Sequence, residues 1–171
     1  ELLQKKNVTE EERQEYAGDI EEAAVRLSNL ISNILKLNKL ENQKIDPEIE
    51  RYDLCGQLEN CILQYEELWD EKEMGLEVDL EERAIVQADP SLLEVVWNNL
   101  ISNALKFTEP GGNVTIRQRA LEGKIEVSVS DTGCGMSEER DRHIFDKFYQ
   151  GDTTHSKAGK GLGLELVKRI I

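Results

Sequence analysis

Between residues 10 and about 41, apolar residues recur at seven-residue intervals. Two series stand side by side: Ile20, Leu27 and Ile34 in one, and Ala23, Leu30 and Leu37 in the other. This spacing predicts one long helix. Ala24 and Ile31 widen the apolar stripe beyond a two-position seam, so a helix packed in a bundle fits it better than a simple two-stranded coil.

The limits of this helix divide the chain. Thr9 and Glu12 match a capping box, in which the Thr9 hydroxyl accepts from the backbone and Glu12 reaches back, so the helix is expected to begin there. At the other end, Asp46-Pro47 disfavours continuation of the helix. We therefore predict two domains, residues 1–46 and residues 47–171.

Beyond Pro47 the predicted strands come in groups. The expected elements are a strand-like segment at 51–54, a helix at 54–71, strands at 75–80 and 84–88, a helix at 90–106, hairpin strands at 113–120 and 124–130, and a helix at 161–171. Strands that do not alternate strictly with helices predict an α+β fold. We expect a two-layer α/β sandwich, with helices on one face of a mixed, mainly antiparallel sheet, preceded by the long bundle-type helix.

The composition excludes some partners. Acids outnumber bases by 35 to 21, and the resulting formal charge of −14 repels polyanions, so nucleic acid is not expected as a partner. No stretch approaches the roughly 20 apolar residues needed to cross a bilayer, so we expect no membrane contact by this fragment. If the parent protein is a membrane receptor, its spans lie outside this chain. Three cysteines without a C-x-x-C pair favour a reducing, cytoplasmic location.

The helix that begins with Asp89 as N-cap and Pro90 at its first position carries the first chemical motif. Asn99, Asn103 and Lys106 stand four and three residues apart and therefore share one helix face. An amide oxygen there can coordinate Mg²⁺, and a lysine can meet a phosphate. Taken alone, the pattern is more typical of a solvated polar face.

Two glycine-containing motifs follow. The sequence D-T-G-C-G-M at 131–136 comes at a strand end, where a carboxylate can accept from the exocyclic amine of adenine and glycines let the backbone pass close to the ring. The sequence G-K-G-L-G-L at 159–164 opens the last helix, whose first backbone amides can hold phosphate oxygens. The first motif is also compatible with an ordinary turn, and the second with glycines that serve packing.

In their order and spacing, these motifs resemble the catalytic, ATP-binding domain of sensor histidine kinases. That domain is part of an ATPase superfamily shared with gyrase, the ninety-kilodalton heat-shock chaperones and the MutL repair protein. The similarity runs from about Tyr52 to Ile171. It assigns residues 99–106 to the N box, 131–136 to the first glycine box, 145–148 to the phenylalanine box and 159–164 to the second glycine box.

By this resemblance the implied cofactors are ATP and Mg²⁺. Asn103 is the implied Mg²⁺ ligand, Asn99 and Lys106 serve the phosphates, and Asp131 binds the adenine amine. The other implied nucleotide-binding residues are Phe107, Gly133, Gly135, Met136, Lys147, Gly159, Lys160, Gly161, Leu162, Gly163 and Leu164. Among them, Phe107 fits a core position equally well.

One departure within the superfamily bears on mechanism. The ATP-hydrolysing relatives carry a glutamate at the position of Asn99, and its carboxylate activates water as a general base. The amide of Asn99 cannot take a proton. The resemblance therefore implies a site that holds ATP and keeps the γ-phosphate for another nucleophile, as a kinase requires.

A histidine kinase also needs an acceptor histidine, which the family carries on the first helix of its dimerisation hairpin. The two histidines of this chain, His143 and His155, lie elsewhere. We therefore expect no catalytic residue in this chain and no autophosphorylation by it alone. Residues 1–46 resemble the C-terminal part of the hairpin, and residues 47–171 resemble the catalytic domain without its usual last strands.

The implied function is the ATP-binding catalytic portion of a sensor histidine kinase, which transfers the γ-phosphate of ATP to a protein histidine in two-component signal transduction. The implied partners are the phosphoacceptor histidine helix of the parent kinase, a response regulator and a second copy in a homodimeric parent. The alternative is a nucleotide-binding scaffold or an anti-sigma-type serine kinase of the same fold. The long helix favours the histidine kinase, because a free-standing serine kinase needs no bundle arm.

Overall fold

The structure is a computed structural model. It describes residues 47–136 and 163–171 without a gap, and positions 9, 12–14, 16–18, 20, 23–24, 27–28 and 31 of the N-terminal part. The chain separates into two compact units, Glu1–Ile45 and Asp46–Ile171. Within the described ranges, none of the helices combines the length and the apolar character that a bilayer span requires.

The first unit shows the predicted capping box. The backbone N–H of Thr9 donates to Glu12 Oε2 (2.8 Å), and the backbone N–H of Glu12 donates to Thr9 Oγ1 (3.2 Å). The described positions from Glu12 to Ile31 are helical. Ile20, Leu27 and Ile31 of the predicted apolar stripe are each more than half exposed. The other positions of the predicted long helix lie outside the described residues, so its full extent stays a prediction.

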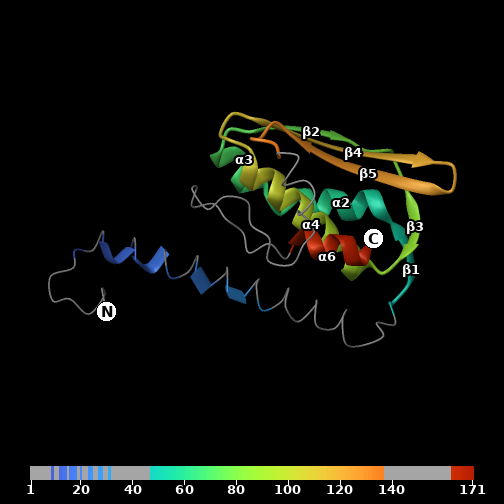
Figure 1. Cartoon of the computed structure of the whole chain (residues 1–171), viewed down its shortest axis with the longest axis horizontal. Helices are drawn as coiled ribbons and strands as arrows, with labels where there is room; N and C mark the ends of the chain where they lie inside the picture. The colour runs from blue at the N-terminus through green and yellow to red at the C-terminus, as the bar shows by residue number, and fades with distance from the viewer. Residues whose placement is uncertain are drawn as a thin grey trace. The chain divides into compact units, whose positions relative to one another are not determined.

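The second unit consists of two sheets and the helices that cover them (Figure 1). In chain order its elements are β1 (Glu50–Asp53), α2 (Leu54–Leu63), α3 (Glu66–Glu71), β2 (Gly75–Asp79), β3 (Ile85–Ala88), α4 (Pro90–Phe107), β4 (Asn113–Leu121), β5 (Lys124–Asp131) and α6 (Gly163–Ile170). Strand β1 pairs antiparallel with β3. The larger sheet has the order β2-β4-β5, with β2 parallel and β5 antiparallel to β4. This mixed sheet, with α2, α4 and α6 on one side, confirms the predicted α+β fold.

Alternate residues of β4 face the helices. Val114 and Ile116 have no exposed surface and join Ile101 and Leu105 of α4 in one apolar core. This alternation follows from the two-residue period of a strand. Val167 of α6 packs against the same core. The core therefore ties to the sheet the two helices that carry the predicted phosphate-binding residues.

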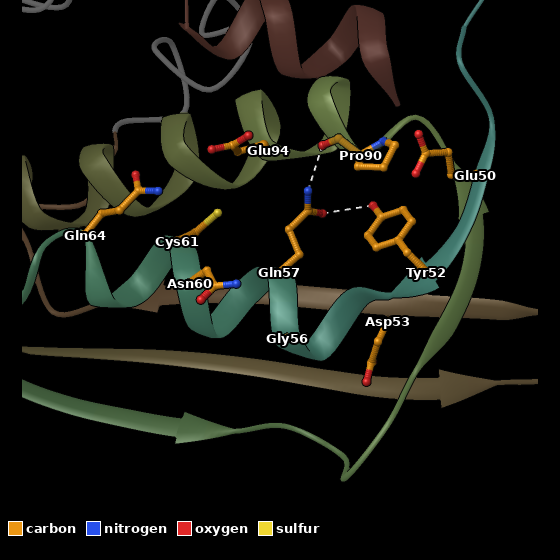
Figure 2. A pocket seen from close by; sticks show the side chains of 10 residues that line it. All are labelled: Glu50, Tyr52, Asp53, Gly56, Gln57, Asn60, Cys61, Gln64, Pro90 and Glu94. Atoms are coloured by element: carbon orange, nitrogen blue, oxygen red, sulfur yellow. Dashed lines mark hydrogen bonds between the residues drawn. The ribbon is translucent and has the colours of Figure 1, made fainter.

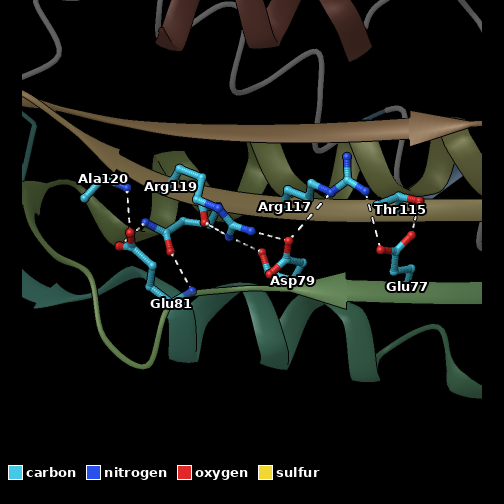
Figure 3. A network of polar contacts seen from close by, with 8 residues as sticks. Glu77, Asp79, Glu81, Thr115, Arg117, Arg119 and Ala120 are labelled. Atoms are coloured by element: carbon cyan, nitrogen blue, oxygen red, sulfur yellow. Dashed lines mark hydrogen bonds and ion pairs between the residues drawn. The ribbon is translucent and has the colours of Figure 1, made fainter.

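The opposite face of the larger sheet carries charges (Figure 3). Arg117 bonds to Glu77 (3.4 Å) and lies 3.7 Å from Asp79, and Arg119 also pairs with Asp79. All four side chains are about half exposed, so each pair contributes on the order of 0–1 kcal/mol. The charges lie along the edge strand β2, where they disfavour pairing with a strand of another molecule.

A buried amide anchors the loop that follows β2. Gln118, which has no exposed surface, accepts from the backbone N–H of Glu81 (3.1 Å) and donates to Glu81 Oε2 (3.2 Å). Glu81 Oε1 accepts from the backbone N–H of Ala120 (3.0 Å), as Figure 3 shows, and this bond together with the Gln118 bond lowers the pKa of Glu81. The Glu81 carboxylate thus continues the pairing of β4 beyond the end of β2.

The prediction of a single helix at 54–71 is wrong, because two helices occupy this stretch. Gln64 is the C-cap of α2, and the backbone N–H of Tyr65 donates to the carbonyl of Ile62 (3.0 Å) before α3 begins. The break lets Tyr65 pack against the core while Trp69 of α3 is buried in it. The apolar spacing runs through the break, so periodicity alone does not reveal it.

A hollow of about 480 Å³ lies between α2 and the start of α4 (Figure 2). Beside it, Gln57 Oε1 accepts from the Tyr52 hydroxyl (2.9 Å) and from Trp97 Nε1 (3.1 Å), and Gln57 Nε2 donates to the Pro90 carbonyl (2.7 Å). Burial, with the charge of Asp89 adding to it, raises the pKa of Tyr52 to about 12, so this hydroxyl remains a donor. Of the predicted nucleotide-binding residues that the structure describes, none lines the hollow.

Candidate nucleotide-binding site

Helix α4 presents the first motif. Its start is as predicted, with Asp89 as N-cap and Pro90 in the first turn. Asp89 Oδ1 accepts from the backbone N–H groups of Ser91 (2.9 Å) and Leu92 (3.1 Å). The apolar side of the helix is buried in the core. Asn99, Asn103 and Lys106 lie on the other side and are partly exposed. The polar face therefore borders solvent, where a ligand can reach it.

The start of α6 lies against Asn99. A Cβ atom at Gly163 would stand 2.4 Å from Asn99 Oδ1, which is closer than van der Waals contact allows. Asn99 Nδ2 donates to the carbonyl of Val95 (2.7 Å), so the amide is held in place. Leu166, one turn further along α6, has no exposed surface. The lack of a side chain at Gly163 thus lets the end of the second glycine motif meet the polar face of α4.

Asp131 ends β5 and begins a tight turn. Its Oδ1 accepts from the backbone N–H of Gly133 (2.9 Å), the Asx-turn bond that aspartate commonly makes. Among the described residues, no donor is bonded to Oδ2, and the side chain is exposed. One carboxylate oxygen is therefore used by the turn, and the other remains available as an acceptor.

The same turn is packed on the end of α4. A Cβ atom at Gly133 would lie 2.5 Å from the carbonyl oxygen and 2.9 Å from the carbonyl carbon of Phe107. Thr132 binds the start of β4, because its Oγ1 accepts from the backbone N–H of Asn113 (2.9 Å) and its N–H donates to the Asn113 carbonyl (3.0 Å). We did not predict this role of Thr132. The D-T-G pattern indicated a turn, but its partner lies 19 positions away.

Apolar surface is exposed next to this turn. Phe107 is 46% exposed and Met136 is 60% exposed. The ammonium of Lys106 lies 5.1 Å from the centroid of the Phe107 ring. Gly135 has a φ of +66°, a conformation that favours glycine. The C-terminal end of α4 thus presents the ring of Phe107 and the ammonium of Lys106, and the turn that begins with the acceptor Asp131 packs on it.

The predicted site is described in part. Leu164 of α6 is partly exposed, beside Gly163. Five predicted residues lie outside the described residues: Lys147, Gly159, Lys160, Gly161 and Leu162. The structure therefore brings Gly163 to Asn99 and the Asp131 turn to Phe107.

Thiol reactivity tests the packing of α2 and of the Asp131 turn. Burial raises the pKa of Cys55 and of Cys61, the latter to about 11 with the charge of Glu94 adding to it, whereas Cys134 is exposed. A raised pKa keeps a thiol protonated and unreactive. At pH 8 we expect one thiol to react rapidly with a chromogenic aromatic disulfide and two to react only as the protein unfolds. Cys134→Ser should remove the fast phase, and more than one fast thiol in the native protein would contradict the packing.

A protein-family model matches the part of the chain that carries these motifs. Residues 88–171 match the family described as histidine kinase-, DNA gyrase B- and HSP90-like ATPases. The matched segment includes α4, the Asp131 turn and α6.

Similar sequences occur in bacterial sensor proteins. The chain is 32% identical to the swarming motility regulation sensor protein RssA of Serratia marcescens, over 95% of this chain and 35% of that protein. It is 33% identical to drug sensory protein A of Synechocystis sp., over 96% of this chain and 26% of that protein. The chain thus spans about a third or less of the length of these curated relatives.

Solved structures share the fold. The catalytic domain of the histidine kinase ThkA matches with a TM-score of 0.66 and 27% identity, over 72% of this chain and 80% of that chain. Full-length ShkA in complex with AMPPNP matches with a TM-score of 0.76 and 26% identity, over 96% of this chain and 34% of that chain.

Proposed function

Residues 88–171 belong to the family of histidine kinase-, DNA gyrase B- and HSP90-like ATPases, and we propose that the chain is the ATP-binding catalytic portion of a sensor histidine kinase. In this proposal it presents the γ-phosphate of ATP to a histidine on another helix of the parent kinase. One observation carries the proposal: two glycines contact α4, Gly163 at Asn99 and Gly133 at Phe107. Two motifs that are distant in sequence therefore border the helix that carries the third.

The Asp131 turn would bind the adenine base. Asp131 Oδ2 would accept from the exocyclic amine, while Oδ1 keeps its bond to the Gly133 amide. The exposed side chains of Phe107 and Met136 would contact the ring. Guanine carries a carbonyl oxygen where adenine carries the amine, and two acceptors would then face each other. The site would therefore select adenine nucleotides.

The polar face of α4 offers an amide oxygen, that of Asn103, which suits Mg²⁺ as a ligand. No three His, Cys, Asp or Glu side chains gather into a metal site within the described ranges. Asn103 would then supply one amide oxygen, with waters and phosphate oxygens completing the shell, which is the manner in which Mg²⁺ is commonly bound. The bound ion would neutralise charge on the phosphates, and the ammonium of Lys106 would add to this effect.

The side chain of Asn99 supports a kinase over a hydrolase. Its amide is bonded to the Val95 carbonyl and faces Gly163, and an amide offers no group that could take a proton from water. ATP held in this site would therefore keep its γ-phosphate until a stronger nucleophile approaches. A histidine of the parent kinase is the nucleophile in this proposal.

In this proposal, transfer of phosphate to the histidine and then to a response regulator belongs to the whole parent protein, of which this chain is a part. We propose that residues 1–46 are the C-terminal part of the dimerisation and phosphoacceptor hairpin, in a homodimeric parent that passes phosphate on to a response regulator. The capping bonds of Thr9 and the exposed apolar positions Ile20, Leu27 and Ile31 support a helix of a bundle. Free cysteines, two of them buried, support a cytoplasmic location for this part.

The Mg²⁺ dependence of ADP binding tests the proposal. We expect chelation of Mg²⁺ to weaken ADP binding to the wild type about tenfold, because the ion bridges protein and phosphates. Asn103→Leu should bind ADP with this weak affinity whether or not Mg²⁺ is present. Isothermal titration calorimetry measures both.

The exposed Asn60 of α2 provides the matched control. Asn60→Leu should keep the full Mg²⁺ dependence. If Asn103→Leu kept the Mg²⁺ dependence of the wild type, Asn103 would be excluded as the Mg²⁺ ligand. A wild type that binds no ADP would overturn the proposed function.

A further inference from the structure

Lys72 belongs to none of the motifs, yet it contacts the helix that carries them. It is the C-cap residue of α3, and its ammonium donates to the carbonyl oxygens of Leu105 and Thr108, the latter at 3.4 Å. These carbonyls stand at the end of α4, on either side of Lys106 and Phe107. In Figure 1, α3 lies beside that end of α4.

A cation is well suited to this position. The last carbonyl groups of a helix have no partner within it and carry a partial negative charge. The ammonium of Lys72 supplies both hydrogen bonds and a compensating charge, in a partly buried place where solvent screens it less. At the same helix end, Thr108, which is fully buried, donates its N–H and its hydroxyl to the carbonyl of Ala104.

The backbone next to Lys72 holds the loop after α4 as well. The Lys72 carbonyl accepts from the N–H of Gly111 (3.0 Å), and the N–H of Gly75 donates to the carbonyl of Gly112 (2.8 Å). The loop leads directly into β4, whose first residue, Asn113, is bonded to Thr132 in the Asp131 turn. Residues 72–75 therefore secure both the end of α4 and its connection to the sheet.

We propose that Lys72 is a positioning residue of the nucleotide site, an inference that rests on the proposed function. Lys72 fixes the last turn of α4, and this turn places the Phe107 carbonyl against Gly133. The Gly133 amide in turn holds Asp131 Oδ1. The carboxylate that selects adenine is thus oriented by an ammonium group that does not touch the nucleotide. Without this group the last turn frays, and the Asp131 turn loses its support.

The test compares ADP with inosine diphosphate, which carries a carbonyl oxygen in place of the adenine amine. Lys72→Met keeps the apolar stem and removes the donor. We expect this variant to bind ADP about tenfold more weakly and to discriminate less between the two nucleotides. Lys72→Arg restores charge and donors and should recover most of both. Lys124→Met, which makes the same change of charge at the exposed start of β5, should change neither.

Calorimetry on the whole chain, with urea unfolding of each variant, separates the outcomes. If Lys72→Met is not folded at the assay temperature, Lys72→Gln, which keeps a donor without charge, takes its place with the same expected direction. Wild-type affinity, or weaker affinity with unchanged discrimination, would overturn the positioning role. That result would leave the proposed function intact as long as the wild type binds ADP and Asp131→Asn binds it about a hundredfold more weakly. Absence of ADP binding by the wild type would overturn both.

Discussion

Asp131→Asn is expected to weaken ADP binding by about a hundredfold, with little change in the free energy of unfolding. In the structure Asp131 Oδ1 accepts from the Gly133 amide, and Oδ2 is left for the adenine amine. Both oxygens must act as acceptors. Asparagine has one acceptor and one donor, so its NH₂ group would face either the Gly133 N–H or the adenine amine. In both orientations two donors oppose each other.

The exposed position of Asp131 makes this prediction specific to binding. Its side chain contributes no core packing, so urea unfolding should be close to that of the wild type. Asp70→Asn, the same change at an exposed position on α3, serves as the control and should bind ADP normally. Calorimetry measures the affinities. An Asp131→Asn variant within threefold or so of the wild type would exclude Asp131 from base recognition.

Gly133→Ala should remove measurable ADP binding and lower the free energy of unfolding by about 1–3 kcal/mol. The added Cβ would lie 2.5 Å from the Phe107 carbonyl oxygen and 2.9 Å from its carbon. These are backbone atoms at the end of a helix, so no rotation of a side chain relieves the contact. The turn must move away from α4, and Asp131 moves with it.

Gly56→Ala is the matched control. Gly56 lies within α2, and apart from its chain neighbours and the nearby backbone of its own helix, no atom stands within 4 Å of the Cβ that alanine would add. Because glycine within a helix costs about 0.5–1 kcal/mol relative to alanine, this variant should be more stable than the wild type by that amount and bind ADP unchanged. Calorimetry and urea unfolding provide both readouts. Gly133→Ala with wild-type affinity would mean that the turn does not need its contact with α4.

The parts of the fold that were predictable from sequence depend on local signals. The N-cap Asp89 with Pro90, and the polar face of Asn99, Asn103 and Lys106, follow from helix geometry, and α4 confirms the cap. The hairpin of β4 and β5 follows from alternation around Gly123, which has the positive φ of a turn glycine. These signals act over a few residues, and a sequence displays them directly.

The parts that were not predictable depend on distant partners. The ammonium of Lys72 reaches carbonyl groups 33 and 36 positions away, and Thr132 binds a strand residue 19 positions away. Nothing beside Lys72 in the sequence distinguishes it from a solvated surface lysine. The break between α2 and α3 was missed for a related reason, since Tyr65 turns toward the carbonyl of Asn98 on another helix (3.5 Å). Tertiary contacts decide all three.

The length of α4 between its two glycine contacts fixes the distance between the two glycine motifs. Gly163 meets Asn99 and Gly133 meets Phe107, and eight residues at a rise of about 1.5 Å set these contacts about 12 Å apart along the axis. One residue inserted between them would rotate one contact about 100° relative to the other. Insertions at the Gly123 hairpin would leave the spacing unchanged. We therefore expect natural length variation in this domain to occur in its loops, and the interval from Asn99 to Phe107 to keep its length.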